Sequence, residues 1–348
     1  MTAQSAPHTK WTVALGLGAG AALAVGLVVL AFLWPTKTMA TQNLPVSIVG
    51  DADAVSAVGS AMEQAVPGAI ELVTAADRDA ALEQILTRET YGAIVLSPSA
   101  PEVLTAPAAS AASTQMLTQL GGQLQAQLQA QAAAAGAAAP TVAITPVVPL
   151  SATDPTGTGL AGAAFPLAMG GMIGGVLVSL AVVGPVRRIA AVTAFGVGAG
   201  LVVTLVLHTW FEFLQGGFWM NVLALGLAIS ATSAFIVGCA SLIGRAGIAI
   251  GAVVTLFVAN PLSAAAVPWQ FLAEPWGAIG QYLVPGAAMN LVRTISYFPD
   301  ADATKQWLVL LAWFAIGVVL TVAGHYRSQE PMHVPQATLE PEVEAASA

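Results

Sequence analysis

Few side chains of this sequence lie where they could do chemistry, and the most suggestive are His208 and Glu212. They are four residues apart, about one helical turn, at the end of a long apolar run. Ionisable groups within apolar helices are candidates for proton transfer or ion passage. A proton relay would need further carboxylates at depth, and the apolar runs carry none. We therefore expect a polar pair at the membrane edge, with mutual pairing of His208 and Glu212 favoured over a relay.

The motifs that would indicate an enzyme are missing from the sequence. It has no GxxxxGK[ST] loop, so we expect this chain not to hydrolyse ATP itself. It has no serine-centred elbow, no HExxH and no Cys–His arrangement. Four scattered histidines fit no metal-ligand spacing: His8, His208, His325 and His333. We expect no catalytic residue, no metal and no cofactor.

Several aspartates lie at expected helix starts. Asp51 and Asp77 each precede a helical segment, where a carboxylate stabilises the exposed N–H groups. Asp154 and Pro155 precede an apolar run, so Asp154 is expected to cap that helix and Pro155 to occupy its first turn. Capping is favoured over acid–base catalysis for all of these carboxylates.

The composition points to a membrane protein. Of 348 residues, 57% are hydrophobic and only 8% are charged, whereas soluble domains average about 25% charged residues. The net charge of −8 comes without a basic patch, so no nucleic-acid partner is expected. The single cysteine, Cys239, falls in an apolar run and excludes an intrachain disulfide.

The apolar runs are distributed one plus five. The first covers 11–34, and five more follow between 159 and 326: 159–184, 189–213, 220–243, 248–266 and 307–326. A helix of about 20 apolar residues crosses a bilayer. The first run exceeds the roughly 7–15 residues of a signal peptide and lacks a small-x-small cleavage pattern, so it is expected to be retained. The predicted fold is an α-helical integral membrane protein with six transmembrane helices and an inserted extracytoplasmic α/β domain.

The basic residues suggest an orientation. Six crossings place both termini on one side, which five cations flank: Lys10, Arg187, Arg188, Arg245 and Arg327. Three cations lie near span ends on the other side: Lys37, Arg293 and Lys305. The positive-inside rule then makes 1–10 a cytoplasmic N-terminus and 327–348 a cytoplasmic tail, which is expected to be disordered. The richness in Ala, Gly and Val is typical of a high-GC bacterium, and the expected location is the bacterial cytoplasmic membrane.

The segment 35–158 reads as one α/β domain. Strand-like runs cover 44–49, 70–73, 91–96, 102–105 and 141–145, and helical segments cover 52–65 and 77–87. This alternation predicts a sheet with mainly parallel strands. A long amphipathic helix is expected near 109–135, with a leucine stripe on one face and glutamines on the other. Packing of that stripe on its own domain is favoured over a partner surface.

Small residues recur at helical spacing in the membrane runs. Six glycines form pairs four apart on shared helix faces: Gly170, Gly171, Gly174, Gly175, Gly196 and Gly200. Such faces let helix backbones approach closely in lipid. Packing within the bundle is favoured over a dimer seam or a translocation path. Farther along, 268–298 is too polar and broken to cross the bilayer, because Pro268, Pro275 and Pro285 interrupt it. Trp269 and Trp276 belong to the same candidate segment.

Several stretches, together with the one-plus-five layout, carry a family resemblance: LPVSIVGD (44–51), YGAIVL (91–96), VPLSATDPTG (148–157), Asn260-Pro261, PWQFLAEPWG (268–277) and QYLVPGA (281–287). The chain resembles ABC transporter permeases of the type-2 exporter class, close to the phage-infection-protein family of bacterial membrane proteins. The resemblance implies a re-entrant outer segment near 268–298. It also implies a homodimer, or a heterodimer with a related permease, driven by a separate ABC ATPase.

The resemblance leaves two functions open. In the first, the chain is a permease that exports a lipid, a drug or an envelope component, and the ATPase couples through the turn at Arg187 and Arg188. The cargo would be apolar or amphipathic because the membrane path lacks charge. In the second, it is an envelope interaction or scaffold protein whose outer domain binds a partner. Membrane lipids are partners in both cases.

Overall fold

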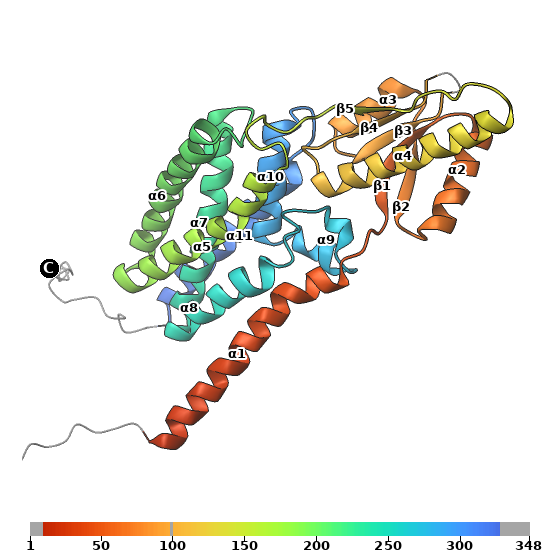
Figure 1. The fold of residues 1–348 in the computed structure, drawn as a ribbon. Helices are drawn as coiled ribbons and strands as arrows, with labels where there is room; N and C mark the ends of the chain where they lie inside the picture. Colours follow the sequence, from red (N-terminus) through yellow and green to blue (C-terminus); the bar gives the residue numbers. More distant parts are fainter. Residues whose placement is uncertain (1–9, 98–99, 328–348) are drawn as a thin grey trace, which may run out of the picture.

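The computed structural model describes residues 10–97 and 100–327 (Figure 1). The described chain is mostly helical, with a small sheet domain between its first and second long helices. The predicted cytoplasmic ends lie almost wholly outside the described residues, which exclude 1–9 and 328–348.

Long apolar helices dominate the structure, as expected of a multi-pass membrane protein. Within 10–97 and 100–327, five are long and apolar enough to cross a bilayer: α1 (Trp11–Thr38), α5 (Thr158–Ala181), α6 (Pro185–Thr204) continued by the π-helix η1 (Leu205–Trp210), α7 (Phe218–Ile243) and α11 (Thr304–His325).

The helix in the fifth predicted span, 248–266, is shorter than expected. It corresponds to α8 (Arg245–Ala252) continued by the π-helix η2 (Val253–Ala259), and the helix stops before Pro261. At 1.5 Å per residue these two segments extend about 22 Å, less than the roughly 30 Å hydrocarbon core of a bilayer. The count of six crossings therefore stays a prediction.

The bundle packs around α7, which contacts α5, α6, α8, α10 and α11. Glycines on the neighbouring helices permit this approach. A Cβ on Gly200 of α6 would lie 2.7 Å from the Cα of Gly226, and a Cβ on Gly171 of α5 would lie 2.8 Å from the Thr232 Cβ. Gly175 and Gly196 also face α7.

The remaining two predicted packing glycines behave differently. Gly174 faces Phe195 of α6, whereas Gly170 faces open space. Five of the six residues Gly170, Gly171, Gly174, Gly175, Gly196 and Gly200 thus lie at close contacts within the bundle. These contacts are of the kind that drives helix association in lipid.

The described part of the sheet domain contains five strands in the order β2-β1-β3-β4-β5: β1 (Leu44–Val49), β2 (Ile70–Thr74), β3 (Gly92–Val95), β4 (Glu102–Thr105) and β5 (Ala143–Pro146). The pairs are parallel except for β3 with β4. Three helices accompany them: α2 (Ala52–Ala65), α3 (Arg78–Leu86) and α4 (Ala111–Ala134).

Helices cover both faces of this sheet. Side chains alternate between faces along a strand, so Ala93 packs with Ile85 of α3 while Ile94 packs with Leu117 of α4. Leu117 of the apolar stripe of α4 is therefore buried against the sheet of its own domain.

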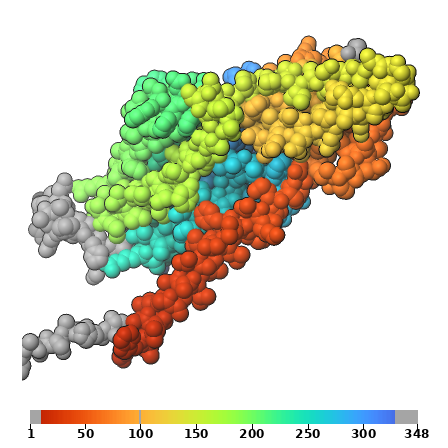
Figure 2. Space-filling model, in the orientation of Figure 1, coloured from red at the N-terminus to blue at the C-terminus, as the bar shows by residue number. Residues whose placement is uncertain are grey.

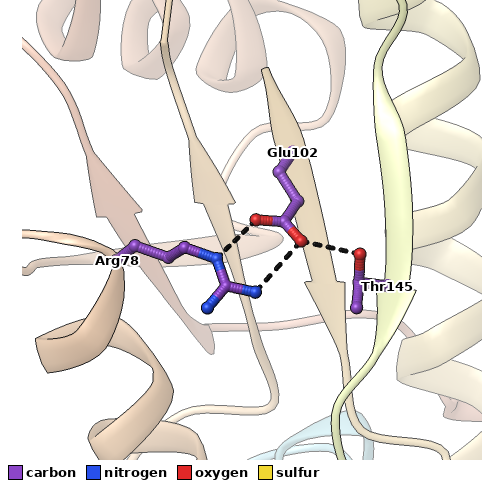
Figure 3. Close-up of polar contacts among 3 residues, drawn as sticks. All are labelled: Arg78, Glu102 and Thr145. Carbon is purple, nitrogen blue, oxygen red and sulfur yellow. Dashed lines mark hydrogen bonds and ion pairs between the residues drawn. The ribbon is translucent and has the colours of Figure 1, made fainter. Parts of the chain in front are cut away.

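A polar contact joins α3 to the far edge of the sheet (Figure 3). Arg78 Nε donates to Glu102 Oε2 at 2.6 Å, and Thr145 Oγ1 donates to Glu102 Oε1 at 2.6 Å. The hydrogen bond from Arg78 lowers the pKa of Glu102. The contact therefore loses its stabilising effect as the pH falls through that lowered pKa. Because Arg78 is largely exposed, the pair contributes at most about 1 kcal/mol.

Two of the three aspartates expected at helix starts cap their helices, and the third does not. Asp77 caps α3, accepting from the Ala80 N–H at 2.8 Å, and Asp154 Oδ2 accepts from the Gly159 and Leu160 N–H groups of α5. Asp51 occupies the position before α2 but its side chain makes no cap bond. Pro155 was expected in the first turn of α5, and this is wrong because the helix begins three residues later at Thr158.

The segment 268–298 is broken into short helices, as its prolines predict. It contains the 3₁₀ turn η3 (Trp269–Phe271), α9 (Trp276–Gly280) and α10 (Val284–Tyr297), with Pro285 in the first turn of α10. Phe271 and Phe298 join the two cores of the sheet domain, whereas Leu291 joins the core of the bundle. The segment therefore lies between the two parts of the molecule (Figure 1).

The close approach of α6 and α7 can be tested at Gly226, whose Cβ would lie 3.0 Å from the Gly196 carbonyl oxygen. Gly226→Val should destabilise the detergent-solubilised protein by about 1–3 kcal/mol through overpacking, measured as a lowered melting temperature. Gly198→Val is the matched control, because a Cβ there meets nothing within 4 Å. Equal melting temperatures for the two variants would contradict this packing.

Candidate functional site

The predicted polar pair is not formed. His208 lies in η1, and its Nδ1 is 3.3 Å from Asn221 Nδ2 of α7. Glu212 follows the end of the helix, has a φ of 57°, and is exposed. The pairing of His208 with Glu212 is wrong because the chain leaves the helix after Trp210, so the spacing of one helical turn no longer applies. The salt bridge found in the described residues is the one between Arg78 and Glu102.

The two arginines of the predicted coupling turn have different surroundings. Arg188 Nε donates to the Val182 carbonyl at 2.8 Å, its Nη2 to the Ser179 carbonyl at 3.2 Å, and its Nη1 to Ser241 Oγ at 2.8 Å. It therefore caps the last turn of α5 and ties that turn to α7. Arg187 is exposed on the surface. Of the two side chains, Arg188 is the one that is partly buried in the bundle.

The most elaborate polar contact lies where the sheet domain meets the bundle. Arg88 follows α3 and has a φ of 64°, the left-handed conformation of a helix C-cap, in which the Glu89 N–H donates to the Gln84 carbonyl at 2.8 Å. Its Nη1 donates to Asn290 Oδ1 at 2.5 Å, to the Asn290 carbonyl at 3.3 Å and to Thr294 Oγ1. Its guanidinium also lies 5.2 Å from the Phe298 ring centroid. These contacts fix the sheet domain to α10.

Arg293 lies one position before Thr294 on α10. Its Nη2 donates to the Ala265 carbonyl at 2.8 Å. Arg293 and Arg88 line the same small pocket, together with Tyr91, Gln281 and Asn290. No carboxylate within residues 10–97 and 100–327 forms a salt bridge with either arginine. Burial lowers the pKa of Arg88 to about 10, and the nearby charge of Arg293 adds to this lowering.

Sequence reasoning missed this cluster. From the sequence, Arg293 was considered only as a cation flanking a span, and Arg88 was not considered as a site residue. The two are about 200 residues apart in the sequence and belong to no motif. Arg293 gave a signal, being an isolated cation between Glu274 and Asp300, whereas Arg88 is followed directly by Glu89 in a charged stretch and gave none.

Two cavities adjoin α10. An apolar crevice between α5, α7 and α10 is nearly closed, at about 30 Å³, and is lined among others by Ala164, Ala228 and Met289. A second cavity, of about 290 Å³, lies between the start of α4, the turn before α5 and Arg293. One water needs roughly 10–15 Å³ by such a measure, so the second cavity is large enough for a polar ligand.

Neither a family nor a metal centre is indicated by the remaining observations. No family model, curated protein or solved structure matches the chain. In the part of the chain that the structure describes, no group of three or more His, Cys, Asp or Glu side chains is placed to hold a metal ion. Function must therefore be argued from the chain's own residues.

The contact of Arg88 with α10 can be tested by Arg88→Met. This substitution keeps an apolar side chain but removes the guanidinium and its hydrogen bonds, and it leaves Asn290 Oδ1 without this donor. We expect a loss of about 1–3 kcal/mol, measured by thermal unfolding of the full chain in detergent. Arg78→Met is the control and should cost at most about 1 kcal/mol, since its ion pair is exposed. A smaller effect at Arg88 than at Arg78 would refute this role.

Proposed function

We propose that the chain is the membrane-spanning permease subunit of an ABC-type exporter in the bacterial cytoplasmic membrane. Both termini lie in the cytoplasm, the sheet domain lies outside, and a separate ATPase supplies the energy. The cargo is apolar or amphipathic. Support comes from the long apolar helices, from the sheet domain inserted after the first of them, and from the resemblance carried by the sequence.

The observation that carries this proposal is the broken segment 268–298, which is packed between the sheet domain and the bundle. Broken backbone at membrane depth is tolerated where protein covers it, and discontinuous helices form substrate sites in transporters. The segment is also folded tightly on itself. A Cβ on Gly277 would lie 1.9 Å from the Trp269 carbonyl oxygen, and one on Gly286 would lie 2.2 Å from the Gly280 carbonyl oxygen.

The apolar crevice supports the assignment of cargo. Its walls come from α5, α7 and α10, and they carry no charged side chain. At about 30 Å³ the crevice is closed, so passage of a cargo requires α10 to move away from α5 or α7. Because Arg88 ties α10 to the sheet domain, a movement of the outer domain would be transmitted to the crevice.

Helix α1 supports an association in the membrane. It runs away from the bundle and contacts it only near its C-terminal end (Figures 1 and 2). There Phe32 lies 6.0 Å from Phe165 and 6.4 Å from Phe257, and Trp34 lies 6.1 Å from Trp276, measured between ring centroids. The rest of α1 is available to lipids and to a second permease subunit, either identical or related.

One observation favours the alternative function, an envelope scaffold. A groove of about 350 Å³ runs between α2 and α4 of the sheet domain. Its lining combines apolar side chains, such as Met62 and Leu120, with glutamines such as Gln123. In this alternative the outer domain binds a partner there, and the membrane helices serve as an anchor without ATP-driven transport.

The proposed topology predicts opposite locations for two engineered cysteines. In a Cys239→Ser background, Ser60→Cys on α2 should react with a membrane-impermeant thiol reagent added to intact cells. Tyr326→Cys should react only after the cells are permeabilised. Five crossings separate these positions if α8 with η2 crosses the membrane. Labelling of both cysteines from outside would show that α8 and η2 do not cross.

The proposed mechanism predicts a nucleotide-binding partner. The tagged chain, purified in mild detergent from its native membranes, should bring down an ATPase identified by mass spectrometry and by ATP hydrolysis. Arg187→Glu should reduce its recovery about tenfold or more, because the substitution places a like charge where a positive one was complementary. Lys37→Glu, on the opposite side of the membrane, is the control and should leave recovery unchanged.

The outcomes separate the two functions. If no ATPase accompanies the wild-type chain, the scaffold function replaces the permease. If the ATPase accompanies Arg187→Glu as well as the wild type, the coupling turn is wrongly placed. Arg188 is left intact throughout, because its loss would disturb the end of α5.

A further inference from the structure

The cavity of about 290 Å³ lies at the junction of three elements. It is lined by the first residues of α4, by the turn that leads into α5, and by Arg293 of α10. The start of α4 lies beside α10 in Figure 1. The cavity is therefore bounded by both the sheet domain and the outer end of the bundle.

Positive charge is concentrated on one side of this cavity. Arg293 lines this cavity and also the adjoining small pocket, which Arg88 lines as well. A charge enclosed by protein is normally paired, because the cost of removing it from water is large. Within the described residues neither guanidinium forms a salt bridge with a carboxylate. An anion bound in the cavity would supply the missing partner.

A helix start adds to this positive side. Helix α4 is 24 residues long, and Ser110 caps it by accepting from the Ser113 N–H at 3.3 Å. The N–H groups of Ala111 and Ala112, which line the cavity, have no protein acceptor in the described chain. The start of a helix carries partial positive charge, and its N–H groups bind phosphate and similar anions.

The rest of the lining suits an anion with an apolar attachment. The Thr156 and Thr158 hydroxyls lie 3.1 Å apart and both line the cavity. Leu150, Leu160 and Ala266 supply apolar walls. The N–H groups that begin α5 are already used by Asp154, so an anion belongs on the α4 side.

We propose that this cavity binds a phosphate group, held by the Arg293 guanidinium and by the N–H groups that begin α4. A guanidinium matches phosphate oxygens in a bidentate arrangement, and the helix start provides the second set of donors. The phosphate belongs either to a lipid headgroup or to free phosphate. Binding requires neither the ATPase nor transport, so the inference goes beyond the proposed function and does not depend on it.

The test uses the full chain, delipidated and purified in a neutral detergent. Dissociation constants are measured by calorimetry for inorganic phosphate and for dioctanoyl phosphatidic acid, with dioctanoylglycerol as the probe that lacks phosphate. Phospholipid retained after purification is measured by native mass spectrometry. We expect saturable binding of a phosphate-bearing probe and no binding of dioctanoylglycerol at the cavity.

Two variants test the assigned donors by different means. Arg293→Gln removes the charge and should weaken binding about tenfold or more, because hydrogen bonds to charged groups are the strong ones. Ala111→Asp puts a carboxylate at the start of α4, where it should stabilise the helix yet repel the phosphate. Since Ala111 is exposed, this variant stays informative if Arg293→Gln fails to fold. Lys305→Gln removes an equal charge elsewhere and should bind as the wild type does.

Each outcome either supports or overturns the proposed phosphate site. Binding of inorganic phosphate that both variants weaken identifies free phosphate as a ligand. Binding of phosphatidic acid alone, or a retained phospholipid that both variants lose, identifies a lipid headgroup. Absence of saturable binding and of retained phospholipid overturns the proposal. So does binding by Ala111→Asp that equals that of the wild type.

Discussion

The arrangement of this protein depends on one side chain, Arg88, which crosses from the sheet domain to α10. Its donors reach Asn290 and Thr294, while the other side of α10 is buried in the bundle through Met289 and Leu291. Because α10 is held from both sides, the position of the sheet domain over the bundle is set by this contact together with the burial of Phe271 and Phe298 in the sheet domain, and not by the connecting chain alone. The left-handed C-cap that ends α3 places Arg88 at this contact.

The two faces of α10 link the proposals made for this chain. Asn290, Arg293 and Thr294 lie three and four residues apart and face the sheet domain and the charged cavity. Met289 and Val292 line the apolar crevice toward α5 and α7. One short helix therefore separates a region suited to phosphate from a region suited to hydrocarbon. That separation matches an amphipathic molecule better than a purely apolar one.

Local sequence patterns predicted most of the helices and strands, but they could not predict the contacts between segments that are distant in the sequence. The run 44–49 became β1 and 52–65 became α2, because side-chain period and helix-start residues are local properties. The antiparallel pairing of β3 with β4 was not apparent, since period alone does not set strand direction. The pairing of His208 with Glu212 was wrong because η1 ends at Trp210. The helix in 248–266 is shorter than its apolar run because hydropathy measures apolarity and not helix length. Arg88 and Arg293 come together only in the folded chain.

The central claim is that the sheet domain and the bundle form one unit joined through α10, and a distance between them tests it directly. Spin labels at Ser60→Cys on α2 and Val197→Cys on α6, both exposed positions, can be placed in a Cys239→Ser background in lipid nanodiscs. Double electron–electron resonance should give one narrow distribution of distances between the two labels, and this distribution should broaden when Arg88 is replaced by methionine. A broad distribution with Arg88 intact would contradict the account, because it would show that the domain moves freely over the bundle.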